Sequence, residues 1–290
     1  MIEWNQERVG QFFSYARERQ EIWYKRYVLK QPPPWTDDPI LRAYSFCENF
    51  RQLDRGTKYA IENILTLPAP EDRVFVTMFY RLFNNPTTMD RLGIKNIAAF
   101  DRKAIQKDLL GMQRAGEKVF RAAYMTSAIT TSGPGGKIKE YCRVLFKAHI
   151  QRIKLTAYLK DAPNMEAAWD LVKEVRWFGP FIAYQVVLDL NYDPYFHWPE
   201  ADWVYCGPGA QRGLNWLLKE PLKKQNDLIA AINQLTELQT SYLRGFKYPP
   251  GISKLSNHDC EFICCEFLKW TRIQNGGKKT RRFEGGQTSE

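Results

Sequence analysis

The chain has 290 residues, of which 44% are hydrophobic and 26% charged, and it carries a formal net charge of +10. This length suits one large domain or two lobes that share a cleft, with a core that needs no disulfide staples. The excess of positive charge favours nucleic acid as a partner over the alternative of a merely soluble basic protein.

Neither a membrane segment nor a metal site is expected. No apolar run approaches the length of a bilayer span, and the N-terminus lacks the apolar core of a secretion signal, so we expect a cytosolic protein without a membrane partner. The six cysteines have no regular spacing, which indicates reduced thiols. Cys260, Cys264 and Cys265 cannot provide the four thiolates of an iron–sulfur cluster, and we expect His258 and Glu261 beside them to be structural. No cofactor is expected.

Helix-period spacing of apolar residues dominates the chain and predicts a mostly α fold. Helices are expected near residues 3–28, 39–65, 71–83, 96–109, 115–129, 137–159, 165–175, 181–190, 210–219, 225–242 and 257–272. We expect one helical domain over residues 1–272, with two lobes, a cleft between them and a hinge near 132–136. Residues 273–290 are expected to form a disordered basic tail.

The first candidate substrate surface lies on the helix expected at residues 39–65. Its polar face would carry Glu48, Arg51 and Arg55, with Asn49 and Asp54 at the borders. Polar groups of both signs on one helix can read a base edge and clamp a phosphate, whereas the alternative is a simply solvated face. Two nearby aromatic residues, Trp35 and Tyr44, are candidates for stacking on an unpaired base or for the core.

A second candidate is the elbow Trp-Phe-Gly-Pro, which joins two helix-period runs between residues 165 and 190. Gly179 is expected to adopt a backbone angle closed to other residues, and Pro180 to begin the second helix. The amides of the elbow would then face an anion such as a DNA phosphate. An ordinary helical hairpin is the alternative.

Beyond the elbow, Gln185, Asp189 and Tyr192 recur on one polar stripe. The turn at Gly207-Pro208-Gly209 is expected to form an anion-binding nest at the start of a helix. The elbow resembles that of helix-hairpin-helix DNA glycosylases, in which an aspartate about twenty residues further along the chain stabilises the sugar cation. Asp202, 23 residues after Gly179, would take this place, with Glu200 in reserve.

Several short motifs, taken together, resemble one family over roughly residues 15–270. They are ERQ, IWYKR, PWTDDPIL, NFRQLDR, RLFNN, FGPFIAYQVVLDLNY, GPGAQRG and HDCEFICCEF. The family is the helical family of DNA base hypermodification proteins, which includes the helical domain of 5-hydroxymethyluracil DNA kinases and the α-glutamyl/putrescinyl-thymine pyrophosphorylases. It resembles a divergent branch of the helix-hairpin-helix DNA glycosylase superfamily. The resemblance implies a two-lobed, glycosylase-like helical fold that acts on DNA carrying modified pyrimidines. No obligate protein partner is evident from the sequence.

The spacing and the resemblance together lead to three sets of site residues. Catalysis is assigned to Asp202, Glu200 and Asp54. The base pocket is assigned to Trp35, Asp37, Tyr44, Glu48, Asn49, Arg51, Arg55, Asn84, Gln185, Asp189 and Asn191, and the resemblance adds Arg19. Contacts to DNA phosphates are assigned to Lys173, Arg176, Phe178, Gly179, Gly207 and Gly209.

Two chemistries and one non-enzymatic role are compatible with these residues. The preferred prediction is a DNA glycosylase that flips out and hydrolytically excises a modified pyrimidine, in a role such as phage defence. The alternative is a transferase that displaces diphosphate from phosphorylated 5-hydroxymethyluracil with an amine or amino acid. A third hypothesis is a DNA-binding subunit without catalysis. Phosphoryl transfer from ATP is not expected, because the sequence contains no GxxxxGK[ST] loop.

Overall fold

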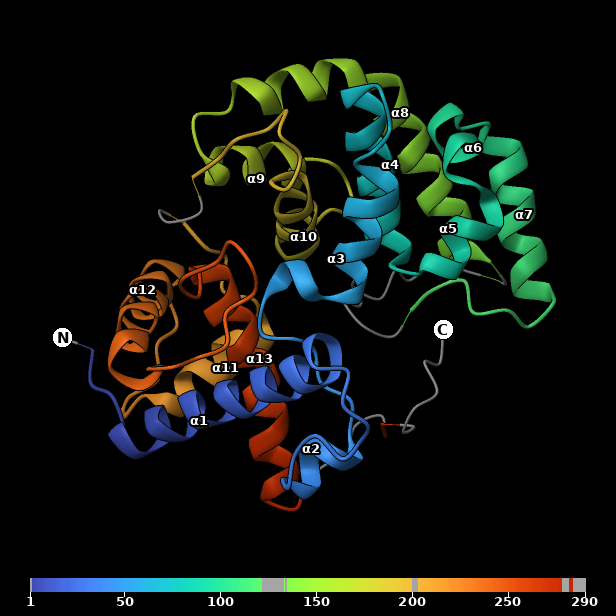
Figure 1. Ribbon diagram of the computed structural model, residues 1–290. Helices are drawn as coiled ribbons and strands as arrows, with labels where there is room; N and C mark the ends of the chain where they lie inside the picture. Colours follow the sequence, from blue (N-terminus) through green and yellow to red (C-terminus); the bar gives the residue numbers. More distant parts are fainter. Residues whose placement is uncertain (1, 122–132, 134, 200–202, 278–281, 284–290) are drawn as a thin grey trace. The chain divides into compact units, whose positions relative to one another are not determined.

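The computed structural model describes residues 2–121, 133, 135–199, 203–277 and 282–283 (Figure 1). These residues form thirteen α-helices and three shorter helical turns, and apart from two isolated bridges they contain no strand. The mostly α prediction is confirmed. The chain forms two compact units, Met1–Asp54 with Glu200–Glu290, and Arg55–Pro199. No helix among the described residues is both long and apolar enough to cross a membrane.

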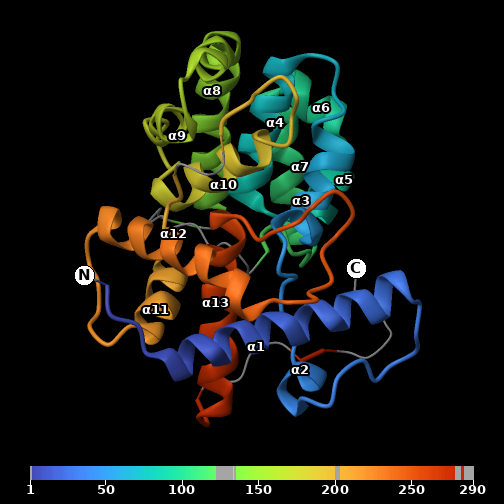
Figure 2. The same ribbon diagram turned by 60° about the vertical axis from the view of Figure 1, so that its left-hand side comes forward.

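The first unit is built around α13 (Asn257–Gln274), which packs against α1 (Gln6–Trp23) and α11 (Pro208–Leu217) (Figure 2). Its other helices are α2 (Pro39–Ala43) and α12 (Gln225–Tyr242), with a π-helical turn at Tyr24–Val28 and a 3-10 turn at Arg51–Leu53. Ser256 and Asp259 form a reciprocal capping box that starts α13.

Two glycines explain how closely α11 approaches α13. A Cβ atom on Gly213 would lie 2.0 Å from the backbone oxygen of Cys264, and one on Gly209 would lie 2.6 Å from the Cys265 sulfur. Both glycines lie on the same face of α11, because they are four residues apart. The GPGAQRG motif therefore contributes to helix packing in this unit.

The second unit has α4 (Pro70–Phe83) and α10 (Pro180–Leu190) at its centre. Every residue of α10 from Ile182 to Leu190 is buried, including the polar residues Gln185 and Asp189. Around them lie α3 (Arg55–Tyr59) with its π-helical turn Ala60–Ile64, α5 (Pro86–Leu92), α6 (Ile94–Ala99), α7 (Arg102–Arg114), α8 (Gly136–Asp161) and α9 (Met165–Lys173).

The prediction of one continuous helix over residues 39–65 is wrong. Helix α2 ends at Ala43, and residues 45–50 are not helical. Polar groups there bind remote partners instead: the amide of Cys47 donates to Glu266 at 2.8 Å, and the Asn49 side chain donates to the Ala16 carbonyl oxygen at 2.6 Å. The predicted polar face that joined Glu48, Arg51 and Arg55 is therefore not formed.

Other boundaries also differ from the expectation. Helix α5, which begins at Pro86, was missed, and the expected helix 96–109 is divided by Phe100, whose φ is 43°. Residues 115–121 are not helical, and the rest of the expected helix 115–129 lies outside the described residues. The segment 132–136 falls inside the second unit, and the expected hinge stays a prediction. Within the expected tail, the Phe283 amide donates to the Ala43 oxygen, while residues 278–281 and 284–290 are not described.

Candidate substrate-binding site

The elbow between α9 and α10 has the predicted helices on both sides but a different backbone. Gly179 has φ −57° and ψ 172°, which many residues adopt, whereas Trp177 has φ 71°. The prediction of a special angle at Gly179 is wrong. The indole N–H of Trp177 donates to Glu140 of α8 at 2.8 Å, and this contact helps to hold Trp177 in a conformation that costs free energy.

Glu140 also organises the basic side chains beside the elbow. Arg143 donates two hydrogen bonds to its carboxylate, each 2.8 Å long, and the Arg176 guanidinium lies 3.3 Å away. The Arg143 hydrogen bonds are the main reason that the pKa of Glu140 falls to about 2. The Arg176 side chain is 65% exposed, so it presents positive charge to solvent at this surface.

The other elbow residues differ in what they expose. The Phe178 side chain is fully buried and its amide donates to the Val175 oxygen. A DNA phosphate at the elbow would therefore have to be bound by groups other than Phe178. Lys173 pairs with Asp170 and lies 3.9 Å from the centroid of the Trp169 ring. Nothing lies within 4 Å of a Cβ placed on Gly179, which leaves room for a ligand to approach the backbone.

A buried polar network crosses the core of the second unit. Arg81 donates from Nε and Nη2 to the two carboxylate oxygens of Asp189, and both side chains are 0% exposed. The same guanidinium donates to Thr57 at 3.4 Å and to Asn84 at 3.1 Å. Asn84 has φ 48° at the C-terminus of α4. Two predicted base-pocket residues, Asp189 and Asn84, therefore bind the same side chain, that of Arg81. Arg81 was not among the predicted site residues, although it is the first residue of the RLFNN motif.

Two further predicted base-pocket residues of this unit also lie on or beside α10. Gln185 is buried on the turn before Asp189, with 2% of its surface exposed. Asn191, at the C-terminus of α10, accepts a hydrogen bond from the Trp198 amide at 3.1 Å. Asn191 thus fixes the chain that follows α10.

Arg55, another predicted base-pocket residue of this unit, is exposed and begins α3.

In the first unit, a polar cluster forms where α13 begins. The amide of Arg51 donates to Asp259 at 2.9 Å, and its guanidinium carbon lies 5.3 Å from the centroid of the Phe262 ring. The amide of Gly207 donates to Glu261 at 3.1 Å. The Gly207 amide is therefore directed at the carboxyl group of Glu261, and the predicted contact of this turn with a DNA phosphate stays a prediction.

Burial changes the protonation of this cluster. It raises the pKa of Glu261 to about 7, although the Gly207 amide and the Arg51 charge act in the opposite direction. Burial also lowers the pKa of His258 to about 3, with a further contribution from Arg51. The cluster therefore combines a carboxyl group that titrates near neutrality with a neutral imidazole. Sequence reasoning treated both residues as structural, because burial depends on the tertiary fold.

Predicted residues on α1 and in the segment that follows α2 brace the chain around them. Arg19 donates to the carbonyl oxygens of Phe46 and Cys47 and pairs with Glu48 at 3.2 Å. Tyr44 is buried at the end of α2. Glu48 and Arg19 thus hold the non-helical segment 45–50 against α1, together with the buried Asn49.

The remaining candidates of the first unit lie in three different places. Trp35 donates to the Gln31 oxygen at 2.7 Å, and the Arg26 guanidinium lies 5.1 Å from the centroid of its ring. Asp37 is exposed and lines a pocket of about 620 Å³. Asp54 follows the 3-10 turn and is half-buried. Asp202 and Glu200 lie outside the described residues, so their catalytic role stays a prediction.

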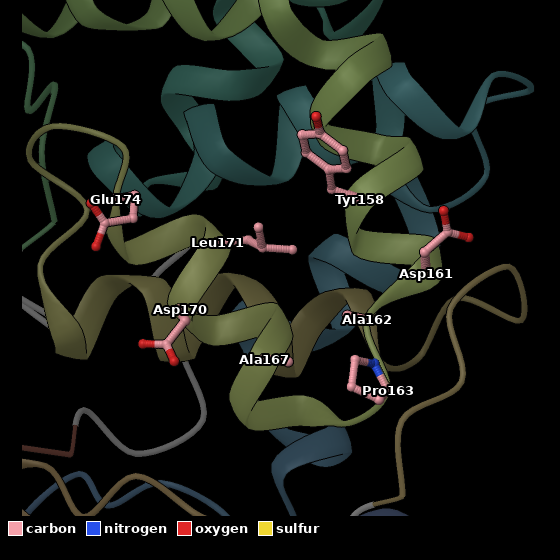
Figure 3. Close-up of a pocket in the computed structure, with 8 residues that line it drawn as sticks. All are labelled: Tyr158, Asp161, Ala162, Pro163, Ala167, Asp170, Leu171 and Glu174. Atoms are coloured by element: carbon pink, nitrogen blue, oxygen red, sulfur yellow. The ribbon is translucent and has the colours of Figure 1, made fainter.

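A second pocket, of about 520 Å³, lies between the end of α8 and α9 (Figure 3). Tyr158 and Leu171 form part of its apolar lining, and Asp161, Asp170 and Glu174 lie around it. None of the predicted site residues lines it. Among the described residues, no group of three or more histidine, cysteine or acidic side chains is arranged to hold a metal ion.

Comparison with known proteins identifies the family. Residues 6–280 match the family described as "5-hmdU DNA kinase, helical domain". A protein of Bacillus phage SP10 named "5-hmdU DNA kinase" is 28% identical over 281 residues, which cover 89% of this chain and 44% of the phage protein. The chain thus spans less than half of this relative's length. No solved structure matches the chain.

These findings correct the preferred functional prediction. The relative carries the name of a kinase, so the prediction of a DNA glycosylase, and with it of a hydrolase, is wrong. The predicted resemblance to hypermodification proteins is confirmed, whereas the expected link to the glycosylase superfamily is not shown. The chain belongs to the family of 5-hmdU DNA kinase helical domains.

Proposed function

We propose that this protein binds DNA that contains 5-hydroxymethyluracil, or its phosphorylated form, and takes part in group transfer at that base. The observation that carries the proposal is the family match over residues 6–280, which spans both compact units. The phage relative is named for the same modified nucleoside. The name of this relative and the transferase alternative from the sequence support chemistry at the hydroxymethyl group, away from the bond between base and sugar.

Two transfer reactions are compatible with these two forms of the base. In one, the hydroxymethyl oxygen of the unphosphorylated base attacks the terminal phosphorus of a nucleoside triphosphate such as ATP, loses its proton to a general base, and the nucleoside diphosphate leaves. In the other, an amine or amino acid attacks the methylene carbon, the carbon–oxygen bond breaks and diphosphate leaves. Either reaction requires the base to leave the duplex stack, which costs a few kcal/mol that contacts to the DNA backbone must offset. The net charge of +10 and the exposed Arg176 at the elbow support such contacts.

For the chemical step, we assign proton transfer to Glu261 and anion binding to Arg51. A carboxyl group whose pKa is raised to about 7 can accept the proton that a hydroxyl group or an attacking amine loses. A guanidinium suits the oxygens of a phosphate or diphosphate group. Both residues belong to the cluster at the start of α13, together with the Gly207 turn.

A binding assay and a product assay test the proposal separately. Duplex oligonucleotides that differ only in one thymine or 5-hydroxymethyluracil are compared by fluorescence anisotropy, and tighter binding of the modified duplex is expected. The same duplexes, and duplexes with the diphosphorylated base, are then incubated with ATP or with a mixture of amines. Digestion to nucleosides and mass spectrometry distinguish a phosphoryl product from an amine adduct.

Matched variants assign the chemical step. Glu261→Gln is expected to abolish product while modified DNA still binds, whereas Glu237→Gln, at an exposed position of α12, is expected to change neither. If the modified duplex binds more tightly but no incubation yields a product, the protein is a DNA-binding subunit without catalysis. Equal binding of both duplexes together with no product would overturn the proposal.

A further inference from the structure

Helix α8 exposes a row of apolar side chains on its outer face. Phe146, Ile150 and Ile153 are 39%, 63% and 64% exposed, and Ala157, one turn further on, is also exposed. Among the described residues, the other large hydrophobic side chains exposed to a comparable degree are Tyr158, beside this row, and residues 27–29. Such a contiguous apolar row on a water-facing helix is typical of an interaction surface.

The spacing of the row identifies the kind of surface. Positions 146, 150, 153 and 157 follow steps of four, three and four residues, which is the a/d pattern of a helix that packs lengthwise against another helix. The row extends for about 16 Å at 1.5 Å per residue. The inner face of α8 is separate, since Tyr141, Leu145 and Ala148 are buried in the second unit. Helix α8 therefore has a second apolar face that remains exposed.

The charged residues beside the row indicate which kind of partner it binds. Lys147 and Lys154 are both exposed and lie one heptad apart, at the position that flanks the apolar seam on one side. The other flank carries His149 and Thr156. If the whole row overlaps with that of a second copy of α8, Lys147 and Lys154 face each other in an antiparallel pair or the His149 flank in a parallel pair. Asp161, one heptad beyond Lys154 on the same flank, is reached only in a shifted pair that leaves part of the row uncovered. A helix with glutamate or aspartate in its flanking positions offers a carboxylate to both lysines while it covers the whole row.

A lipid surface fits less well. The acidic side chains Asp161, Asp170 and Glu174 lie around the pocket at the C-terminal end of α8, next to Tyr158 (Figure 3). Of these, Asp161 lies one heptad beyond Lys154 on the same flank of the row, where its carboxylate would repel the headgroups of an anionic membrane. The combination of an apolar seam with charges of both signs is typical of a protein interface.

We infer that the outer face of α8 is a docking surface for an amphipathic helix of another protein, with apolar residues along its seam and acidic residues opposite Lys147 and Lys154. The inference is independent of the proposed group transfer, because it uses no residue of the elbow or of the cluster at α13. It adds a protein partner to a chain for which the sequence indicated only DNA.

Two labelled helical peptides of about three heptads test this inference with the full chain. Both carry leucine and isoleucine along the seam, and they differ in having glutamate or lysine at the flanking positions. Fluorescence anisotropy should show the glutamate peptide binding at least about tenfold more tightly than the lysine peptide. The double variant K147E/K154E should invert this preference, and Ile153→Asp should abolish binding of both peptides.

Val28→Asp serves as the matched control, because Val28 is a similarly exposed aliphatic side chain of the first unit, and it should leave peptide binding unchanged. Circular dichroism confirms that every variant is folded. The inference is overturned if the glutamate peptide shows no binding at roughly 100 µM, or if both peptides bind equally. It is also overturned if sedimentation shows a dimer that Ile153→Asp dissociates, or if anionic phospholipid vesicles bind the chain in an Ile153-dependent manner.

Discussion

Replacement of Asp189 by asparagine should destabilise the second unit strongly. The Arg81 and Asp189 side chains are 0% exposed, and each carboxylate oxygen accepts a hydrogen bond from the guanidinium. Asparagine keeps one acceptor but removes the negative charge, so Arg81 would remain charged in a medium that solvates it poorly. Breaking a buried pair in this way costs about 3–5 kcal/mol.

Urea unfolding followed by circular dichroism measures this cost. The matched control is Asp170→Asn, because Asp170 pairs with Lys173 while its side chain remains 57% exposed. An exposed pair contributes about 0–1 kcal/mol, so this control should unfold close to the wild type. The double variant R81M/D189L should recover part of the loss, since it leaves no unpaired charge. An Asp189→Asn protein that unfolds within about 1 kcal/mol of the wild type would refute the reasoning.

Three further predictions concern helix packing, pH dependence and DNA binding. Gly213→Ala should lower the unfolding free energy by more than about 2 kcal/mol, because its Cβ would overlap a backbone oxygen of α13. Gly179→Ala, which has open space around its Cβ, should leave urea unfolding unchanged but weaken DNA binding. Similar stability of both variants would contradict the packing argument. Burial raises the pKa of Glu261 from 4.5 to about 7, so between these pH values the folded protein retains a proton that the unfolded chain has released. The unfolding free energy should therefore fall as pH rises through this interval, by up to about 1.4 kcal/mol per pH unit. His258, whose pKa is lowered to about 3, gives an opposite slope below pH 6.5, so the wild type should be compared with Glu261→Gln; a flat difference between pH 5 and 7 would count against the burial argument. Arg176→Ala should weaken binding to all DNA sequences alike and reduce the salt slope by about 1, as measured by anisotropy at several salt concentrations; an unchanged slope would remove Arg176 from the phosphate contacts.

The sequence alone was sufficient for the helices whose pattern is local. The expected segments 71–83, 137–159, 225–242 and 257–272 agree closely with α4, α8, α12 and α13, because apolar spacing and capping residues act within a few turns. The family was also recognisable, since its motifs are contiguous. The chemistry was predicted wrongly, because excision and group transfer both begin with a flipped base and the same residue types suit either.

The tertiary structure decided everything that depends on contacts between distant residues. The Asp189 carboxylate meets Arg81 across 108 positions of the chain, and the Gly207 amide meets Glu261 across 54. Residues 45–50 leave the helix that their pattern predicted, because the Cys47 amide binds Glu266 of α13 instead. Whether a side chain is buried, and therefore how far its pKa shifts, depends on which surfaces pack together. Periodicity shows that a helix has an apolar face but does not show what covers it, so the exposed seam of α8 emerged only from the fold.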